Sequence, residues 1–213
     1  GTEDHRPHPP AMFPQQIAPH VYRCGYNAHV SFGAHAYFVQ AEGGNLLIDS
    51  PRYVIKLQQA FEQMGGIADI LLTHQDDVAA ADRYARQFGA RVRIHEHDRS
   101  AAPYATDVLT GTAPVRIRDD LLAIPVPGHT RGSVVYLWRG TYLFTGDSLS
   151  WNRKREQLCA FRDVCWYSWD ELKLSLGRLA EHRFEWLLPG HGHSVQLDAV
   201  KMQAELRALV QRM

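Results

Sequence analysis

The chain has 213 residues, 45% hydrophobic and 22% charged, a composition typical of a folded protein with a full hydrophobic core. Lys+Arg and Asp+Glu each number 23, so the chain lacks the basic excess that attracts nucleic acids or anionic membranes. We therefore expect neither as a partner. Three cysteines are too few for a disulfide scaffold, and this favours a reducing, cytoplasmic location.

No apolar run approaches the roughly 20 residues that a membrane-spanning helix needs, and the first residues lack the basic-then-apolar pattern of a signal peptide. The opening is rich in proline and is predicted to form a mobile arm over residues 1–19. The remainder, residues 20–213, is predicted to fold as one domain. The oligomeric state is left open.

The amino-terminal half begins with strands and continues with alternating strands and helices. Strands are predicted over residues 20–24, 34–40, 46–49, 70–72 and 92–95. Helices are predicted between residues 51 and 64 and from about 77 to 88, because apolar side chains recur on one face and glycine follows each segment. This alternation predicts a sheet that is covered by helices.

The carboxyl-terminal half repeats this order of strands followed by helices. Strands are predicted over residues 121–126, 133–138, 141–144 and 186–188. A polar and aromatic loop over residues 147–167 separates the third of these strands from a helix that begins with the capping box Ser168-Trp169-Asp170-Glu171. A final amphipathic helix is predicted from about residue 198 to 210.

Four predicted strands end in side chains that bind metals. His74 and Asp76 follow the strand over residues 70–72, and three further residues each follow a later strand beside a glycine: His129, Asp147 and His191. Imidazole nitrogens and carboxylate oxygens are the ligands of zinc and of non-haem iron. Four such clusters in one chain predict a metal site more readily than four unrelated turns.

Together these segments resemble the metallo-β-lactamase superfamily. The resemblance covers residues 20–210 and rests on five motifs in order: Leu-Ile-Asp, Leu-Leu-Thr-His, Pro-Gly-His-Thr-x-Gly-Ser, Phe-Thr-Gly-Asp and Pro-Gly-His-Gly. It implies a fold of mixed α+β and α/β character, a four-layer αββα sandwich. It also implies an activity among those of the superfamily, which includes glyoxalase II-like thioesterases, lactonases and persulfide dioxygenases.

The first metal motif of that superfamily, His-x-His-x-Asp-His, is degenerate here: its positions fall on His74, Asp76, Val78 and Ala79. Members with two metals bind the first metal at three positions, which the resemblance places at His74, Asp76 and His129. They bind the second metal at four positions, which fall here on Val78, Ala79, Asp147 and His191. Because valine and alanine cannot bind a metal, we predict one divalent ion per chain, held by residues drawn from His74, Asp76, His129, Asp147 and His191.

The ligand set leaves the metal open between zinc and iron, with manganese as a further alternative. Two histidines and one carboxylate match the facial triad of non-haem iron oxygenases, and the resemblance to persulfide dioxygenases implies the same triad at His74, His129 and Asp147. Hydrolysis would need a base in place of the motif's aspartate, and the candidate catalytic residues are Asp76 and Asp77. Asp77 is alternatively a helix cap.

The loop over residues 148–169 combines aromatic rings with arginines. In this fold it borders the metal site, so we predict that it binds a small, anionic and partly apolar substrate. The candidate substrate-binding residues are Arg131, Arg162, Trp166 and Tyr167. The alternative is a packed loop with a solvated charged face.

Three functions are compatible with these patterns. The first is an enzyme, a metal-dependent hydrolase of a small ester or thioester with an atypical mononuclear site. The second is a mononuclear non-haem iron oxygenase that acts on a thiol or persulfide. The third is a catalytically inactive or redox-linked binding module that has kept the fold.

Overall fold

The computed structural model describes residues 13–26 and 34–213. Most of the predicted arm therefore lies outside the described residues. Its last part was assigned wrongly, because Gln15–Ala18 form a strand, β1, that pairs with β2 (Val21–Tyr26). Burial explains the strand: Ala18 is 7% exposed in the hydrophobic core and Ile17 packs against that core.

Two large sheets form the middle of the molecule. The first has seven strands in sequence order, β1 to β7, and the second has six strands in the order β15-β14-β11-β10-β9-β8. The other strands of the first sheet are β3 (His35–Val39), β4 (Leu46–Ile48), β5 (Asp69–Leu71), β6 (Arg91–His95) and β7 (Asp107–Leu109). Those of the second are β8 (Val115–Arg118), β9 (Leu121–Pro125), β10 (Val134–Trp138), β11 (Tyr142–Gly146), β14 (Trp186–Pro189) and β15 (Val195–Gln196).

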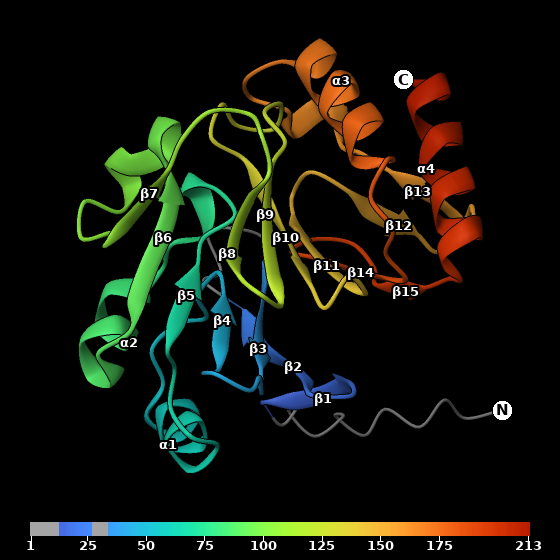
Figure 1. Ribbon diagram of the computed structural model, residues 1–213. Helices are drawn as coiled ribbons and strands as arrows, with labels where there is room; N and C mark the ends of the chain where they lie inside the picture. Colours follow the sequence, from blue (N-terminus) through green and yellow to red (C-terminus); the bar gives the residue numbers. More distant parts are fainter. Residues whose placement is uncertain (1–12, 27–33) are drawn as a thin grey trace, which may run out of the picture.

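Helices cover the outer face of each sheet. The helices α1 (Ile55–Gln63) and α2 (Ala81–Phe88) lie on the side of the first sheet, and α3 (Trp169–Leu179) and α4 (Ala199–Arg212) lie on the side of the second, as Figure 1 shows. Within the described residues, three short 3₁₀ segments also occur: η2 (Gln75–Asp77), η3 (Glu96–Ala101) and η4 (Arg162–Val164). The predicted four-layer αββα sandwich is confirmed.

The buried residues that the structure describes form three hydrophobic cores, and strand β10 contributes side chains to two of them. Val134, Tyr136 and Trp138 belong to the core between the two sheets. Val135 and Leu137 point to the opposite face, into the core that α3 and α4 share with the second sheet. Because successive side chains of a strand alternate between faces, a strand covered on both sides must be apolar throughout.

Two predictions near the candidate site were wrong. The helix expected from residue 77 begins at Ala81, because residues 75–77 form the 3₁₀ turn η2 and Ala79 has a φ of 33°. The loop expected over residues 147–167 contains a hairpin, β12 (Ser150–Asn152) with β13 (Gln157–Cys159). Its turn is polar, Arg153-Lys154-Arg155-Glu156. Strands of three residues are too short for an alternation of apolar and polar side chains to be recognised in the sequence.

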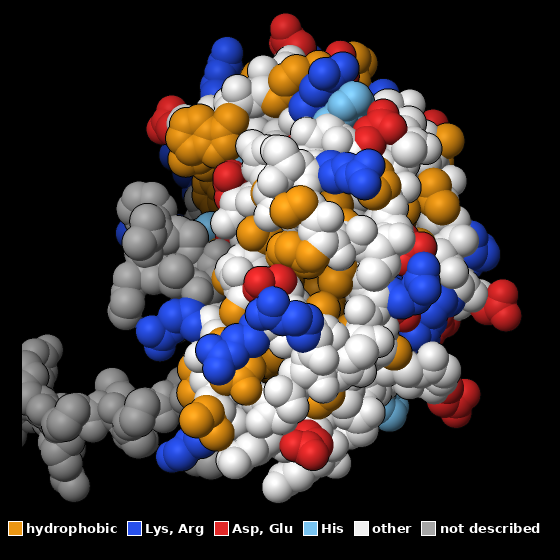
Figure 2. All heavy atoms as spheres, turned by 90° about the vertical axis from the view of Figure 1, so that its left-hand side faces the viewer, with side chains coloured by type: hydrophobic (Ala, Val, Ile, Leu, Met, Phe, Trp, Pro, Cys, Tyr) orange, Lys and Arg blue, Asp and Glu red, His pale blue; other side chains and the backbone are white. Residues whose placement is uncertain are grey.

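Charges on the surface are mixed. On the face shown in Figure 2, Lys and Arg side chains are interspersed with Asp and Glu side chains. A half-buried example is Arg118, which bonds both carboxylate oxygens of Asp120 and lies 3.6 Å from Asp69. Among residues 13–26 and 34–213, we find no helix that is long and apolar enough to cross a bilayer.

The core between the sheets should dominate stability. Replacing Phe144, which is fully buried there, by alanine should lower the free energy of unfolding by about 3–5 kcal/mol, because a large cavity is left. Replacing the 59% exposed Leu174 by alanine is the matched control and should change it by less than about 0.5 kcal/mol. Urea unfolding measures both, and similar losses in the two variants would contradict this packing.

Candidate metal centre

The candidate residues meet because strands of both sheets end at the same edge. His74 follows β5, His129 follows β9, Asp147 follows β11 and His191 follows β14. Backbone hydrogen bonds join these segments: Val134 N donates to the Thr73 carbonyl at 2.8 Å, and Gly190 N to the Gly146 carbonyl at 2.7 Å. The first of these bonds links the two sheets. The site is therefore held by main chain as well as by side chains.

Two imidazoles and two carboxylates surround a common point. The Asp147 Oδ2 atom lies 3.1 Å from His74 Nε2 and 3.4 Å from His129 Nε2. The Asp76 Oδ2 atom lies 3.8 Å and 3.6 Å from the same two nitrogens. The structure thus brings together four residues that the sequence singled out, with both histidines buried and Asp76 at the solvent-exposed side.

The spacing and the missing hydrogen bonds of these atoms suit a bound divalent metal ion better than direct contact among the side chains. Neither Nε2 atom makes a hydrogen bond of normal geometry within the described part of the chain, although both are buried. Leaving such an atom unsatisfied costs about 1–3 kcal/mol. In a tetrahedral zinc site with bonds of ~2.0–2.1 Å, neighbouring ligand atoms lie roughly 3.3 Å apart. The observed spacings of 3.1–3.8 Å bracket that value.

The electrostatics of the cluster favour a cation. Burial lowers the pKa of His74, but the charges of Asp77 and Asp147 outweigh it and raise the pKa to about 10. Burial raises the pKa of Asp147, yet its contacts with three imidazoles hold the pKa far below the ordinary value. Contact with His129 lowers the pKa of Asp76 as well. The carboxylates are therefore ionised and draw positive charge to this point.

A short relay orients the His74 ring. The Thr73 hydroxyl donates to Asp49 Oδ2 at 2.8 Å and lies 2.8 Å from His74 Nδ1. Since a hydroxyl has one proton, it must accept from Nδ1–H, and this leaves the lone pair of Nε2 for a metal. Gly146 makes the relay possible, because a Cβ at that position would collide with Thr73.

A second buried carboxylate, Asp98, joins the two segments that carry the histidines. Its Oδ2 accepts from Gln75 N at 2.9 Å and from the Thr130 hydroxyl at 2.7 Å, and its Oδ1 accepts from Gly132 N at 2.9 Å. A Cβ at position 132 would overlap the Asp98 carboxylate, so glycine is required there. Asp98 thus fixes the distance between the residues beside His74 and those beside His129.

Asp77, the other candidate catalytic residue, is buried beside His74. Its Oδ2 lies 3.4 Å from His74 Nε2, and burial raises its pKa. The alternative of a helix cap was wrong, because the N-cap residue of α2 is Ala80 and no side chain caps that helix.

His191 reaches the cluster through Asp147, since its Nδ1 hydrogen-bonds Asp147 Oδ1. Burial lowers the pKa of the neighbouring His35 to about 4, with help from the charges of Arg23 and His191. The histidine that follows β6, His95, is used elsewhere: its Nε2 bonds the Gly111 carbonyl at 2.7 Å.

The predicted substrate-binding residues are divided between two places. Trp166 and Tyr167 lie beside the centre, because both backbone amides donate to the His129 carbonyl, at 2.9 and 3.3 Å. Their side chains are 65% and 48% exposed. Arg162 instead lies with its guanidinium 5.4 Å from the Trp169 ring, and Arg131 is exposed on the His129 loop. Among the described residues, no hydrogen bond or ion pair links either arginine to the cluster.

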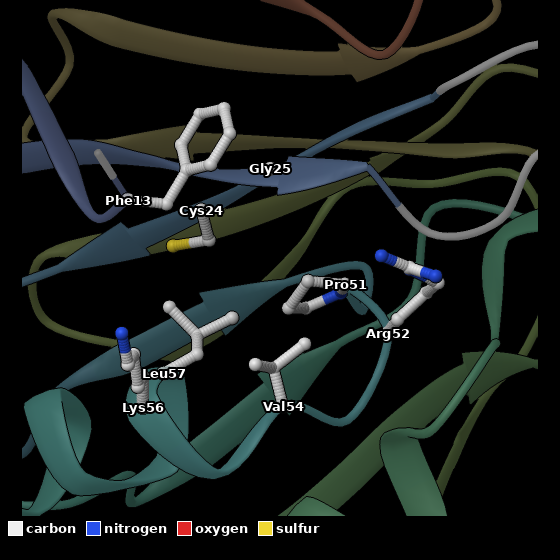
Figure 3. Close-up of a pocket in the computed structure, with 8 residues that line it drawn as sticks. All are labelled: Phe13, Cys24, Gly25, Pro51, Arg52, Val54, Lys56 and Leu57. Atoms are coloured by element: carbon white, nitrogen blue, oxygen red, sulfur yellow. The ribbon is translucent and has the colours of Figure 1, made fainter. Parts of the chain in front are cut away.

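The three cysteines are free, and Cys24 lies apart from the cluster. Cys24 is buried, and burial raises its pKa well above the ordinary value. It lines a cavity of about 240 Å³ whose apolar wall includes Phe13 and Leu57 and whose rim carries Arg52 and Lys56, as Figure 3 shows. None of the candidate metal-binding residues lines this cavity. Burial also raises the pKa of Cys165, whose thiol donates to a backbone carbonyl.

The comparisons with known proteins agree with this fold. A metallo-β-lactamase from Pontibacter korlensis superposes with a TM-score of 0.67 at 18% identity, over 93% of this chain and 98% of that one. The FIM-1 metallo-β-lactamase from Pseudomonas aeruginosa, in a mono-zinc form, gives 0.66 at 17% identity over 92% and 93%. These similarities show that the chain has the fold of the metallo-β-lactamases.

Curated proteins that match part of the chain by sequence are hydroxyacylglutathione hydrolases. One from Fuscovulum blasticum is 35% identical over 113 residues, which are 51% of this chain and 44% of that protein. One from Anaeromyxobacter dehalogenans is 45% identical over 80 residues, 37% and 30% of the two chains. The match thus spans less than half of either relative. No protein-family model matches the chain.

Replacing His129 by alanine should abolish stoichiometric metal binding, because it removes one of the two buried nitrogens that face the cluster. The control is His182→Ala, since His182 follows α3 on the far side of the second sheet. Elemental analysis after dialysis against zinc or iron measures both. Equal metal content in the two variants would refute the site.

Replacing Asp98 by alanine should weaken metal binding by about 10–100-fold, as expected when groups that orient ligands are lost. Asp98→Asn keeps one acceptor oxygen and should retain more affinity than Asp98→Ala. A metal titration with a competing chelator measures the change. An unaltered dissociation constant in the alanine variant would show that Asp98 does not position the histidines.

Proposed function

We propose that this protein is a metal-dependent hydrolase of a small thioester or ester. The observation that carries the proposal is the pair of buried imidazole nitrogens that face the Asp147 carboxylate without hydrogen-bond partners among the described residues. The similarity to hydroxyacylglutathione hydrolases supports a thioester as the substrate. A hydroxyacyl thioester of a small thiol is accordingly the first substrate to test.

His74, His129 and Asp147 would hold one divalent ion, with Asp76 as a further ligand. Such an ion would polarise the carbonyl of the substrate and lower the pKa of a water molecule. His191 would act through its hydrogen bond to Asp147, which restrains that carboxylate. Zinc and iron both accept this donor set, and manganese accepts an oxygen-rich one.

Asp76 is the carboxylate best suited to take a proton from the attacking water. It is ionised, because its contact with His129 lowers its pKa, and its side chain is 43% exposed. A general base must lie within hydrogen-bond reach of the proton that it removes, and solvent reaches Asp76 directly. The side chain of Asp77, by contrast, is 2% exposed beside His74.

The segment after η4 would form the apolar wall of the substrate site. Trp166 and Tyr167 are held against the His129 carbonyl and keep their rings largely exposed. Phe161 approaches the loop of His191, because a Cβ on Gly192 would lie 3.5 Å from its ring. Exposed rings beside a polar centre suit a substrate that has an apolar part next to its reacting carbonyl. Arg131 and Arg162 remain candidates for an anionic group.

A second candidate is a mononuclear iron oxygenase acting on a thiol or persulfide, because His74, His129 and Asp147 are two histidines and one carboxylate. Two additional carboxylates favour hydrolysis, since a facial triad leaves positions open for oxygen and substrate. Asp76 lies near both histidine nitrogens, and Asp77 lies near that of His74. Oxygen consumption distinguishes the two.

The metal-loaded protein should hydrolyse a hydroxyacylglutathione or a related thioester without consuming oxygen. Asp76→Asn should lower kcat by about 10²–10⁴-fold, the usual contribution of a general base. Asp119→Asn, at an exposed position in the turn between β8 and β9, is the control and should leave kcat unchanged. Thiol release measures turnover. Oxygen-dependent oxidation of a persulfide, with no thioester cleavage by a metal-loaded sample, would replace this function by the second candidate.

A further inference from the structure

A second group of polar side chains lies beside the candidate centre, next to the loop of His191. Strand β3 begins at the edge of the first sheet where β4 and β5 end, because β3 is antiparallel to β4 and β4 is parallel to β5. His35, the first residue of β3, donates its backbone N–H to the Gly190 carbonyl at 2.7 Å. The start of β3 is therefore in direct contact with the segment that carries His191.

Arg23 of β2 belongs to the same group. It is the cross-strand partner of Tyr37, so their side chains lie on one face of the sheet, together with that of His35 two residues earlier. This face looks toward the second sheet, because Tyr37 belongs to the core between the sheets. The Tyr37 hydroxyl donates to the Pro189 carbonyl at 2.6 Å, and Pro189 stands two residues before His191.

The electrostatics of two neighbours also place the Arg23 charge at this edge. Burial lowers the pKa of His35 most, and the charges of Arg23 and His191 lower it further. Burial raises the pKa of Tyr37, and the charge of Arg23 acts against this rise. Such effects fall off within about 10 Å. The guanidinium group therefore lies close to both the His35 ring and the Tyr37 hydroxyl.

Arg23 has no anionic partner among the residues that the structure describes. Its Nε atom is buried without a hydrogen-bond partner there, although the residue as a whole is only half-buried. Asp49, whose charge also acts on Tyr37, instead accepts from the Thr73 amide and hydroxyl, each at 2.8 Å. A guanidinium that is partly withdrawn from water without a carboxylate is costly, and its planar set of donors suits a bound anion.

We propose that Arg23 binds a carboxylate of the substrate, and that the protein is selective for thioesters that carry such a group near the reacting carbonyl. The inference rests on the proposed function, because it requires a thioester at the centre. Arg23 stands beside the His191 loop, whereas Trp166 and Tyr167 are held by the His129 carbonyl. The anionic part and the apolar part of the substrate would thus be bound beside different loops of the centre.

The test compares three thioesters as substrates of the whole chain loaded with zinc. One is neutral, the acetyl thioester of N-acetylcysteamine. The succinyl thioester of N-acetylcysteamine carries a carboxylate on its acyl part, and the acetyl thioester of 3-mercaptopropionate carries one on its thiol part. Thiol release measures kcat/KM for each, and the charged thioester that Arg23 affects identifies the part that carries the anion.

Arg23→Gln should lower kcat/KM by about 10–100-fold for one of the two charged thioesters, the loss expected when a hydrogen bond to a charged group is removed. The change should lie in KM and stay below about twofold for the neutral thioester. Arg23→Lys keeps the charge and should recover part of the loss. The control is Arg86→Gln, which removes the same charge from a 77% exposed side chain of α2 and should alter none of the three rates.

Equal losses for neutral and charged thioesters in Arg23→Gln, or no loss for either charged one, would overturn the inference while the proposed function stands. If the unaltered protein cleaves none of the three, the proposed function fails for these substrates. Calorimetric titration with succinate and with 3-mercaptopropionate then decides the inference. Weaker binding of either anion to Arg23→Gln than to Arg86→Gln would support it, and equal binding or no binding would overturn it.

Discussion

Two buried carboxylates that bind backbone amides and hydroxyl groups hold the candidate centre in place. Asp49 holds Thr73, whose hydroxyl orients the His74 ring. Asp98 holds the backbone beside His74 and the backbone beside His129 at once. Because the two histidines come from different sheets, their spacing depends on these bonds. Without them, the mutual repulsion of the inward-facing carboxylates would tend to open the site.

Much of the fold could be predicted because its signals are periodic. Apolar strands such as β10 and amphipathic helices such as α3 follow directly from the spacing of buried side chains. The hairpin β12–β13 and the strand β1 were missed, because three or four residues give no measurable period. The start of α2 was misplaced because the chain turns at Ala79, which is neither glycine nor asparagine.

The gathering of His74, Asp76, His129 and Asp147 could be expected from strand ends, since such ends share an edge of a sheet. The role of Asp98, which joins the two segments that carry the histidines, could not be predicted from the sequence. It follows His95 and His97 in a polar run, and only the fold shows that Asp98 is buried while His95 bonds a carbonyl. The direction of Asp77 depends on a 3₁₀ rather than an α turn, a difference that sequence spacing does not encode.

We propose that the degenerate motif leaves a metal centre that is altered rather than lost. The central claim is one metal ion per chain between two histidines and the aspartates around them. Anomalous X-ray diffraction from crystals grown with the bound metal would test it. We expect a single peak per chain between the side chains of His74, His129 and Asp147. Either the absence of a peak there or two peaks roughly 3.5–4 Å apart, the spacing of a two-metal site, would contradict the account.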